Sequence, residues 1–75
     1  MQTAMIQLKT AEDVKQLVSY VSCCGFDVDL VSGRSIVDGK SIMGIFSLDL
    51  AKPIRLEMHS DNCAAFLEKI ESFLI

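Results

Sequence analysis

Three stretches of the chain alternate apolar and polar residues with a period of two, the pattern of a strand that buries one face. The inward positions are Ala4, Ile6 and Leu8; Phe26, Val28 and Leu30; and Ile54, Leu56 and Met58. Ser32 and Gly33 supply a turn after the second stretch, so a short further strand is expected at residues 34–37. The pattern therefore predicts four strands, the last of them opening at Pro53.

A helix is predicted between the first two strands. Its apolar stripe has the spacing i, i+3, i+4 and i+7 and is formed by Val14, Leu17, Val18 and Val21. Thr10 stands where an N-cap hydroxyl is expected, and Gly25 stands where a left-handed C-terminal cap is expected. The helix should therefore begin at residue 11 and end at Cys23 or Cys24.

Two further helices are expected later in the chain. Residues 41–48 are too apolar for a loop, but the stretch is short and contains Gly44, so this helix should have low intrinsic stability. Ser60 or Asp61 should cap the final helix. The wide apolar face of that helix consists of Cys63, Phe66, Leu67, Ile70, Phe73 and Leu74.

The order of these elements indicates an α+β fold in which one small antiparallel sheet carries its helices on one face. The order is strand, helix, strand, strand, short helix, strand, helix, and 75 residues suffice for one domain over residues 1–75. A split-βαβ arrangement is the default topology for this order. Periodicity cannot choose the order of the strands within the sheet.

The composition excludes several classes of protein. Hydrophobic residues make up 51% of the chain, with only 4 Gly and 1 Pro, which is unlike a disordered segment. The net charge of −3 offers no basic field for nucleic acid or anionic lipid. No apolar run approaches the roughly 20 residues of a membrane span, and no signal peptide opens the chain. We therefore expect a cytoplasmic protein, a monomer or weak dimer, that binds neither nucleic acid nor membrane.

The cysteines and the single histidine indicate no metal site. Cys23, Cys24 and Cys63 fit neither a disulfide framework nor a zinc spacing, and they are expected as buried or half-buried thiols in a reducing compartment. His59 should point away from the core at the end of the last strand, with no second histidine and no cysteine beside it. We therefore expect a solvated surface histidine that belongs to neither a metal site nor a Ser-His-acid triad.

Paired carboxylates are the remaining candidates for catalysis. Asp27 and Asp29 share one strand face, and Asp38 ends the next strand. A chain this small has little room for a deep pocket around them, so a solvated acidic face is the favoured interpretation. No glycine-rich phosphate-binding motif is present. The sequence therefore argues against an enzyme and indicates no cofactor.

The segment from Lys40 to Leu48 offers a different kind of chemistry. Ser41 opens a short helix that carries four apolar residues, Ile42, Met43, Ile45 and Phe46. A phosphate on Ser41 would meet free backbone N–H groups, and a Met-containing patch on so short a helix adapts well to a partner surface. The plainer alternative is an N-cap serine on a helix that faces the core.

The same segment closely resembles the regulatory-serine segment of HPr, the histidine-containing phosphocarrier of the bacterial phosphotransferase system. The similarity runs through Lys-Ser-Ile-Met-Gly-Ile-Phe-Ser-Leu and the Asp-Leu-Ala-Lys that follows. The resemblance implies an open-faced β-sandwich, a four-stranded antiparallel sheet covered by three helices on one face, and it favours the strand order of HPr over the split-βαβ order. It also places Ser41 on the serine that HPr kinase/phosphorylase modifies, and Ile42 and Met43 on helix residues that touch partners.

The resemblance ends at the carrier site. The same alignment puts Thr10 where the family has its phosphorylated histidine, Glu12 where it has an arginine, and Asp13 where a proline opens the helix. A threonine cannot form the labile phosphoimidazole, and the two acids would repel an incoming phosphoryl group. In this respect the chain is similar to the catabolite-repression HPr paralogue, which also lacks the histidine.

The resemblance therefore implies a regulatory binding protein rather than a phosphocarrier, with a role in carbon catabolite regulation. The implied partners are proteins: HPr kinase/phosphorylase and a transcriptional regulator or a metabolic enzyme. Glu12 reverses a charge that the family uses to dock onto its repressor, so that regulator need not be the partner here. Two alternatives stay open, a phosphotransferase component that carries phosphate elsewhere, for example on His59, and an inert dimerising paralogue.

Overall fold

The computed structural model describes all residues from 1 to 75 and contains one sheet with helices on one side of it. The strands are β1 (Gln2–Ile6), β2 (Val28–Ser32), β3 (Ser35–Asp38) and β4 (Ile54–Met58). The helices are α1 (Ala11–Cys23), α2 (Ile42–Phe46) and α3 (Ala64–Lys69), followed by the 3-10 helix η1 (Glu71–Phe73). The α+β fold expected from the order of elements is confirmed.

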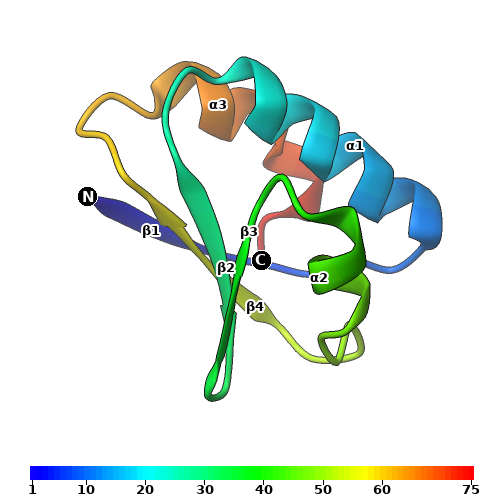
Figure 1. Cartoon of the computed structure of the whole chain (residues 1–75). Coiled ribbons are helices and arrows are strands. Elements are labelled where there is room, and N and C mark those ends of the chain that lie inside the picture. Colours follow the sequence, from blue (N-terminus) through cyan, green and yellow to red (C-terminus); the bar gives the residue numbers. More distant parts are fainter.

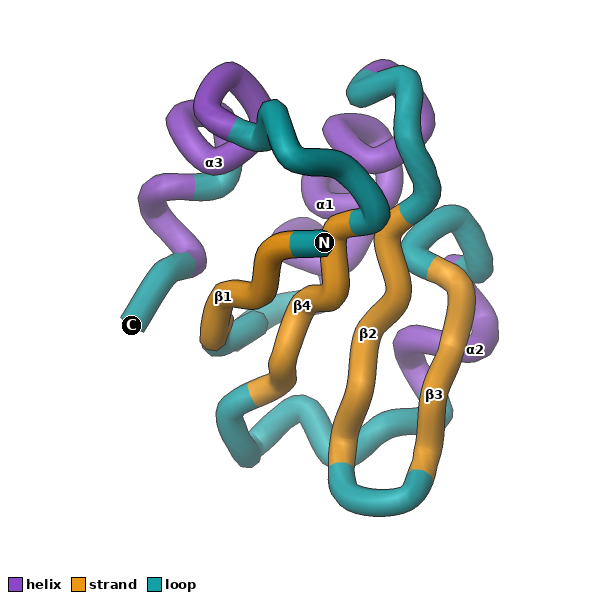
Figure 2. The backbone as a smooth tube through the Cα atoms, turned by 90° about the vertical axis from the view of Figure 1, so that its left-hand side faces the viewer, coloured by secondary structure: helices purple, strands orange, loops and turns teal.

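All neighbouring strands are antiparallel, and their order in the sheet is β1-β4-β2-β3. Figure 2 shows the four strands in this order, with the helices behind them. The last strand in the sequence therefore lies between the first and the second. This is the order that the resemblance to HPr favoured over the split-βαβ arrangement.

The helices cover one face of the sheet (Figure 1). The hydrophobic core lies between these two layers. The inward residues of the two central strands are fully buried, and they are Val28, Leu30, Ile54, Leu56 and Met58. The helices and the segment after β1 contribute buried apolar residues, among them Leu8, Val14, Leu17, Val21, Ile45, Phe66 and Ile70. Since no polar or charged side chain is buried, apolar burial holds this core together.

Helix α1 has the predicted bounds and the predicted caps. The Thr10 hydroxyl accepts a hydrogen bond from the Asp13 backbone N–H at 3.1 Å, and the Asp13 carboxylate accepts one from the Thr10 N–H at 3.3 Å. This reciprocal capping box satisfies backbone donors that a helix leaves free at its start. At the other end Gly25 has a φ of 83°, the left-handed conformation that glycine adopts without steric cost.

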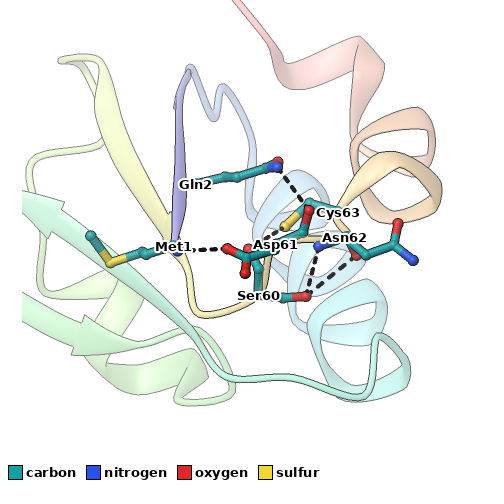
Figure 3. A network of polar contacts seen from close by, with 6 residues as sticks. All are labelled: Met1, Gln2, Ser60, Asp61, Asn62 and Cys63. Atoms are coloured by element: carbon teal, nitrogen blue, oxygen red, sulfur yellow. Dashed lines mark hydrogen bonds and ion pairs between the residues drawn. The ribbon is translucent and has the colours of Figure 1, made fainter.

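The predicted cap of the final helix is wrong. Helix α3 begins at Ala64, and its N-cap residue, Cys63, makes no side-chain cap hydrogen bond. The Ser60 hydroxyl instead accepts from the Asn62 N–H at 3.1 Å, and Asp61 pairs with the Met1 amino group at 3.3 Å (Figure 3). Both expected caps therefore stabilise the loop before the helix and its contact with the start of β1.

The final helix is also shorter than predicted, because it ends at Lys69 and gives way to η1. Phe73 is still buried, but the side chain of Leu74 is exposed. The backbone of Leu74 forms an isolated antiparallel β-bridge with Ile6. The Ile75 N–H donates to the Met5 carbonyl at 3.1 Å. The chain end thus covers part of the free edge of β1, which a helix to Leu74 would have left open.

The cysteines differ from their expected burial at one position. Cys63 is buried and Cys24 is half-buried, as expected, but Cys23 is exposed. Adjacent residues on a helix point about 100° apart, so only one of the two neighbours can face α3 and the core. None of the three helices is long and apolar enough to span a bilayer.

Replacement of Leu56 by alanine should lower the free energy of unfolding by about 2–5 kcal/mol, because it leaves a cavity in the middle of the sheet. Leu56 is fully buried on a strand with partners on both sides. Urea denaturation followed by circular dichroism measures the change. Met43→Ala is the control at an exposed position and should stay within about 0.5 kcal/mol of the wild type. Equal losses in the two variants would contradict this packing.

Thr10→Ala should cost about 1 kcal/mol of stability, because the Asp13 N–H loses its acceptor. Thr10→Ser keeps a hydroxyl at the same position and should retain most of the stability. The same denaturation experiment compares the two variants. If serine and alanine at position 10 destabilise the protein equally, the hydroxyl is not acting as the cap.

Candidate functional site

Ser41 lies where the chain leaves the sheet and starts α2. Two contacts to Asp38 shape this turn: the Ser41 N–H donates to the Asp38 carbonyl at 3.0 Å, and the Lys40 N–H donates to the Asp38 carboxylate at 2.8 Å. Between them, Gly39 approaches β2 so closely that a Cβ there would lie 2.8 Å from the Val28 carbonyl oxygen. A glycine is therefore needed for the chain to turn from β3 toward the helical side.

The Ser41 side chain caps α2, as the sequence predicted. Its hydroxyl accepts a hydrogen bond from the Gly44 N–H at 3.2 Å, and its carbonyl accepts one from the Ile45 N–H at 3.0 Å. A Cβ on Gly44 would lie 2.9 Å from the Ser41 hydroxyl oxygen, so a larger residue would displace the cap. The spacing Ser-x-x-Gly is thus explained by local packing. Ser41 itself is exposed, which leaves its hydroxyl accessible.

The four apolar residues of α2 do not form one surface. Met43 is 82% exposed and Phe46 is 43% exposed, whereas Ile45 has no exposed surface and Ile42 is half-buried. The prediction that Ile45 contacts partners is therefore wrong, because its side chain packs in the core under the sheet. The exposed residues Lys40, Ser41, Met43 and Phe46, with Ile42 at their margin, are called the α2 surface below.

Thr10, which the resemblance to HPr aligns with the phosphorylated histidine, forms the α1 cap described above. Its hydroxyl accepts from the Asp13 N–H, and the Asp13 carboxylate also accepts from the Lys9 N–H at 2.9 Å. Glu12 is exposed in the first turn of the helix, where a negative charge is favoured by the helix dipole. This segment offers helix capping and negative charge, and it contains no imidazole.

His59 lies at the other end of the sheet, directly after β4. The register pairs Met58 with Gln2, whereas the Thr10 segment follows the opposite end of β1. The imidazole is partly exposed, as expected, but it is not isolated: its Nε2 lies 2.9 Å from a carboxylate oxygen of Asp29. Glu57 is also nearby. The contact with Asp29 was missed because it depends on β4 lying beside β2.

Of the other acids singled out from the sequence, Asp38 lies opposite Asp29 across the β2–β3 pair. Asp27 is exposed, and its carbonyl accepts from the His59 N–H at 2.9 Å. Neither lines a pocket. The expected solvated acidic face is the arrangement found, and of these three carboxylates only that of Asp29 contacts the imidazole.

A partly open pocket lies between the end of α1 and α3, with a volume of about 180 Å³. Its walls are mainly apolar and include Tyr20, Cys24, Phe26 and Phe66, the two phenylalanine rings meeting edge to face at 5.8 Å. The only charged side chain at its rim is Lys69.

Comparison with known proteins agrees with the fold. No family model matches the sequence, and no curated protein matches it. The chain is similar to the crystal structure of HPr-C-His from Thermoanaerobacter tengcongensis, with 22% identity, a TM-score of 0.79, and coverage of 96% of this chain and 89% of that one. It is also similar to a phosphocarrier protein HPr from Bacillus anthracis str. Ames, with 20% identity, a TM-score of 0.73, and coverage of 99% and 94%. From the first strand to the last helix, the chain has the fold of HPr.

Proposed function

We propose that this protein is an HPr-like binding protein that carries no phosphohistidine, and that it engages protein partners through the α2 surface under the control of phosphorylation at Ser41. The observation that carries the proposal is the position of an accessible hydroxyl directly beside two exposed apolar side chains, Met43 and Phe46. The resemblance of residues 40–52 to the regulatory segment of HPr supports it.

The α2 surface has the properties of a docking site. Met43 and Phe46 are three residues apart on a helix, so they lie on the same face, and both remain exposed while Ile45 anchors the helix in the core. Methionine adapts to irregular partner surfaces, and aromatic residues contribute strongly to interfaces. The adjoining Lys40 adds one positive charge at the margin. A protein partner with a small apolar pocket and an acidic rim fits this surface.

Phosphorylation of Ser41 would change that surface without disturbing the core. A phosphoserine adds a charge of about −1.5 to −2 next to Met43 and Lys40. The Ser41 oxygen can remain an acceptor for the Gly44 N–H after esterification, because it accepts that bond now and does not donate one. The Asp38 carboxylate, held by the Lys40 N–H, would repel the phosphate. Lys40 and Asp38 balance each other in the unmodified protein, so the modification changes the surface around Ser41 from nearly neutral to negative.

Carriage of phosphate elsewhere on the chain has less support. Thr10 cannot form a phosphoimidazole, and its hydroxyl belongs to the α1 cap. His59 has the required imidazole, but the carboxylates of Asp29 and Glu57 beside it would repel a phosphoryl donor. A role that requires no catalysis fits these sites better than a role in a phosphoryl relay.

The partners that this proposal implies are HPr kinase/phosphorylase and a transcriptional regulator or metabolic enzyme in carbon catabolite regulation. The acidic Glu12 lies in the first turn of α1, where the family has a docking arginine. A regulator that needs that arginine would bind this protein weakly. The inert dimerising paralogue is the alternative, and an elution volume for a compact monomer would remove its dimeric version.

Incubation with ATP and HPr kinase/phosphorylase should add one phosphate, located on Ser41 by intact mass and peptide mapping. The Ser41→Ala variant should gain none, and the Ser47→Ala variant, which removes the other serine of this segment, should gain one as the wild type does. Incubation with phosphoenolpyruvate and Enzyme I should leave every form unmodified. Absence of phosphate in the wild type, or phosphate on another residue, would contradict control through Ser41.

Met43→Asp should lower kcat/KM for phosphorylation of Ser41 by that kinase about tenfold or more, because the kinase must contact the exposed residues around the serine. Met5→Asp is the matched control. It makes the same substitution at another exposed methionine, on the open face of the sheet, and should leave the rate unchanged. Equal rates for the wild type and the Met43 variant would show that the α2 surface is not the contact.

A further inference from the structure

The open face of the sheet carries a cluster of three side chains that can bind a metal ion. Asp29 on β2 and Glu57 on β4 are partners in the β2–β4 register, and His59 follows on the same side two residues after Glu57. One ligand atom from each residue lies within 4.8 Å of those of the other two. The cluster faces away from the α2 surface, because α2 packs on the helical side (Figure 2).

The distances are close to those that a metal ion needs. Zinc binds imidazole nitrogen and carboxylate oxygen at about 2.0–2.2 Å in a tetrahedron, so neighbouring ligand atoms around it lie about 3.3–3.6 Å apart. The Asp29 oxygen and His59 Nε2 are already 2.9 Å apart. Glu57 is partly exposed and on a flexible stem, so a small change of rotamer completes the approach.

The charges around the cluster point to a cation. Glu57, Asp29 and Asp38 lie side by side across β4, β2 and β3, which puts three carboxylates in one row of the sheet. Like charges directly opposite each other destabilise an antiparallel pair. The only cationic side chain in contact is Arg55, whose Nη2 lies 3.2 Å from one Glu57 oxygen. Arg55 contacts Glu57 but not Asp29, which lies between Glu57 and Asp38 in the row. A bound cation would offset the remaining repulsion among these carboxylates.

The kind of ligand decides which cation fits. Calcium and magnesium prefer a shell of oxygen atoms, whereas imidazole nitrogen suits zinc and similar transition metals. One histidine and two carboxylates make three protein ligands, the number in a zinc site that keeps a position for water. His59 and Asp29 are 43% and 34% exposed as side chains, so water can reach that position.

We propose that Asp29, Glu57 and His59 form a zinc-binding site on the open face of the sheet. His59 binds through Nε2 and gives up its hydrogen bond to Asp29, and one oxygen from each carboxylate completes the protein ligands. Because the site joins β2 to β4 in the centre of the sheet, zinc bound there stabilises the folded chain over the unfolded one. This proposal is independent of phosphorylation at Ser41.

Isothermal titration calorimetry of the full chain with Zn²⁺, together with NMR of the His59 imidazole, tests the proposal. We expect one zinc ion per chain, a shift of the His59 resonances during the titration, and a raised Tm with zinc present. His59→Gln and Asp29→Asn should each weaken zinc binding at least about tenfold. Glu57→Gln serves as a further variant that preserves side-chain size, and NMR dispersion verifies that each variant is folded.

Two control variants separate this cluster from other groups that bind zinc. Glu68→Gln removes an exposed carboxylate on α3, and Cys23→Ser removes the exposed thiol. Both should bind zinc as the wild type does. The proposal is overturned if the wild type binds no zinc, if binding is unchanged in His59→Gln, or if Cys23→Ser alone abolishes it.

Discussion

The structure depends on the burial of β4 between β1 and β2. This strand is last in the sequence but central in the sheet, and its inward side chains, Ile54, Leu56 and Met58, are fully buried. Each contributes about 1.5–3 kcal/mol through removal of apolar surface from water. Without β4, the first two strands would have no common partner, since β1 forms hydrogen-bonded pairs with β4 alone among the strands. The four-stranded sheet therefore forms only when β4 pairs with β1, a strand about 50 residues earlier in the sequence.

The same strand also divides the molecule into two surfaces with different chemistry. Alternation along β4 sends its apolar residues toward the helices and places Arg55, Glu57 and His59 on the open face. The α2 surface belongs to the helical side and combines a serine with exposed apolar groups. The open face instead combines an imidazole with carboxylates. A partner on α2 and a cation on the sheet would not compete for the same residues.

Sequence patterns predicted the features that depend on neighbours along the chain. The bounds and both caps of α1 followed from Thr10, one apolar stripe and Gly25, all of them local signals. Features that depend on distant residues were beyond such patterns. Asp61 looked like a helix cap, but it pairs with the Met1 amino group from the start of the chain. His59 looked isolated, because its neighbour Asp29 is separated from it by 30 residues. Strand order came from the resemblance to HPr and not from periodicity.

Ser41 and Thr10 show how the same local structure can stand in different chemical surroundings. Both are N-cap residues whose hydroxyl accepts a backbone N–H three residues later. At Ser41 the acceptor is bound once, by Gly44, and the surrounding α2 surface remains open to a partner. At Thr10 the Asp13 carboxylate accepts hydrogen bonds from the backbone N–H groups of Thr10 and Lys9. The cap is therefore hydrogen-bonded in both directions, and it carries a negative charge. A phosphoryl group at position 10 would meet those acids, whereas at position 41 it would meet Lys40 on one side and Asp38 on the other. The difference lies in the side chains around each cap, and it is the physical reason to look for control at α2 rather than for a carrier at α1.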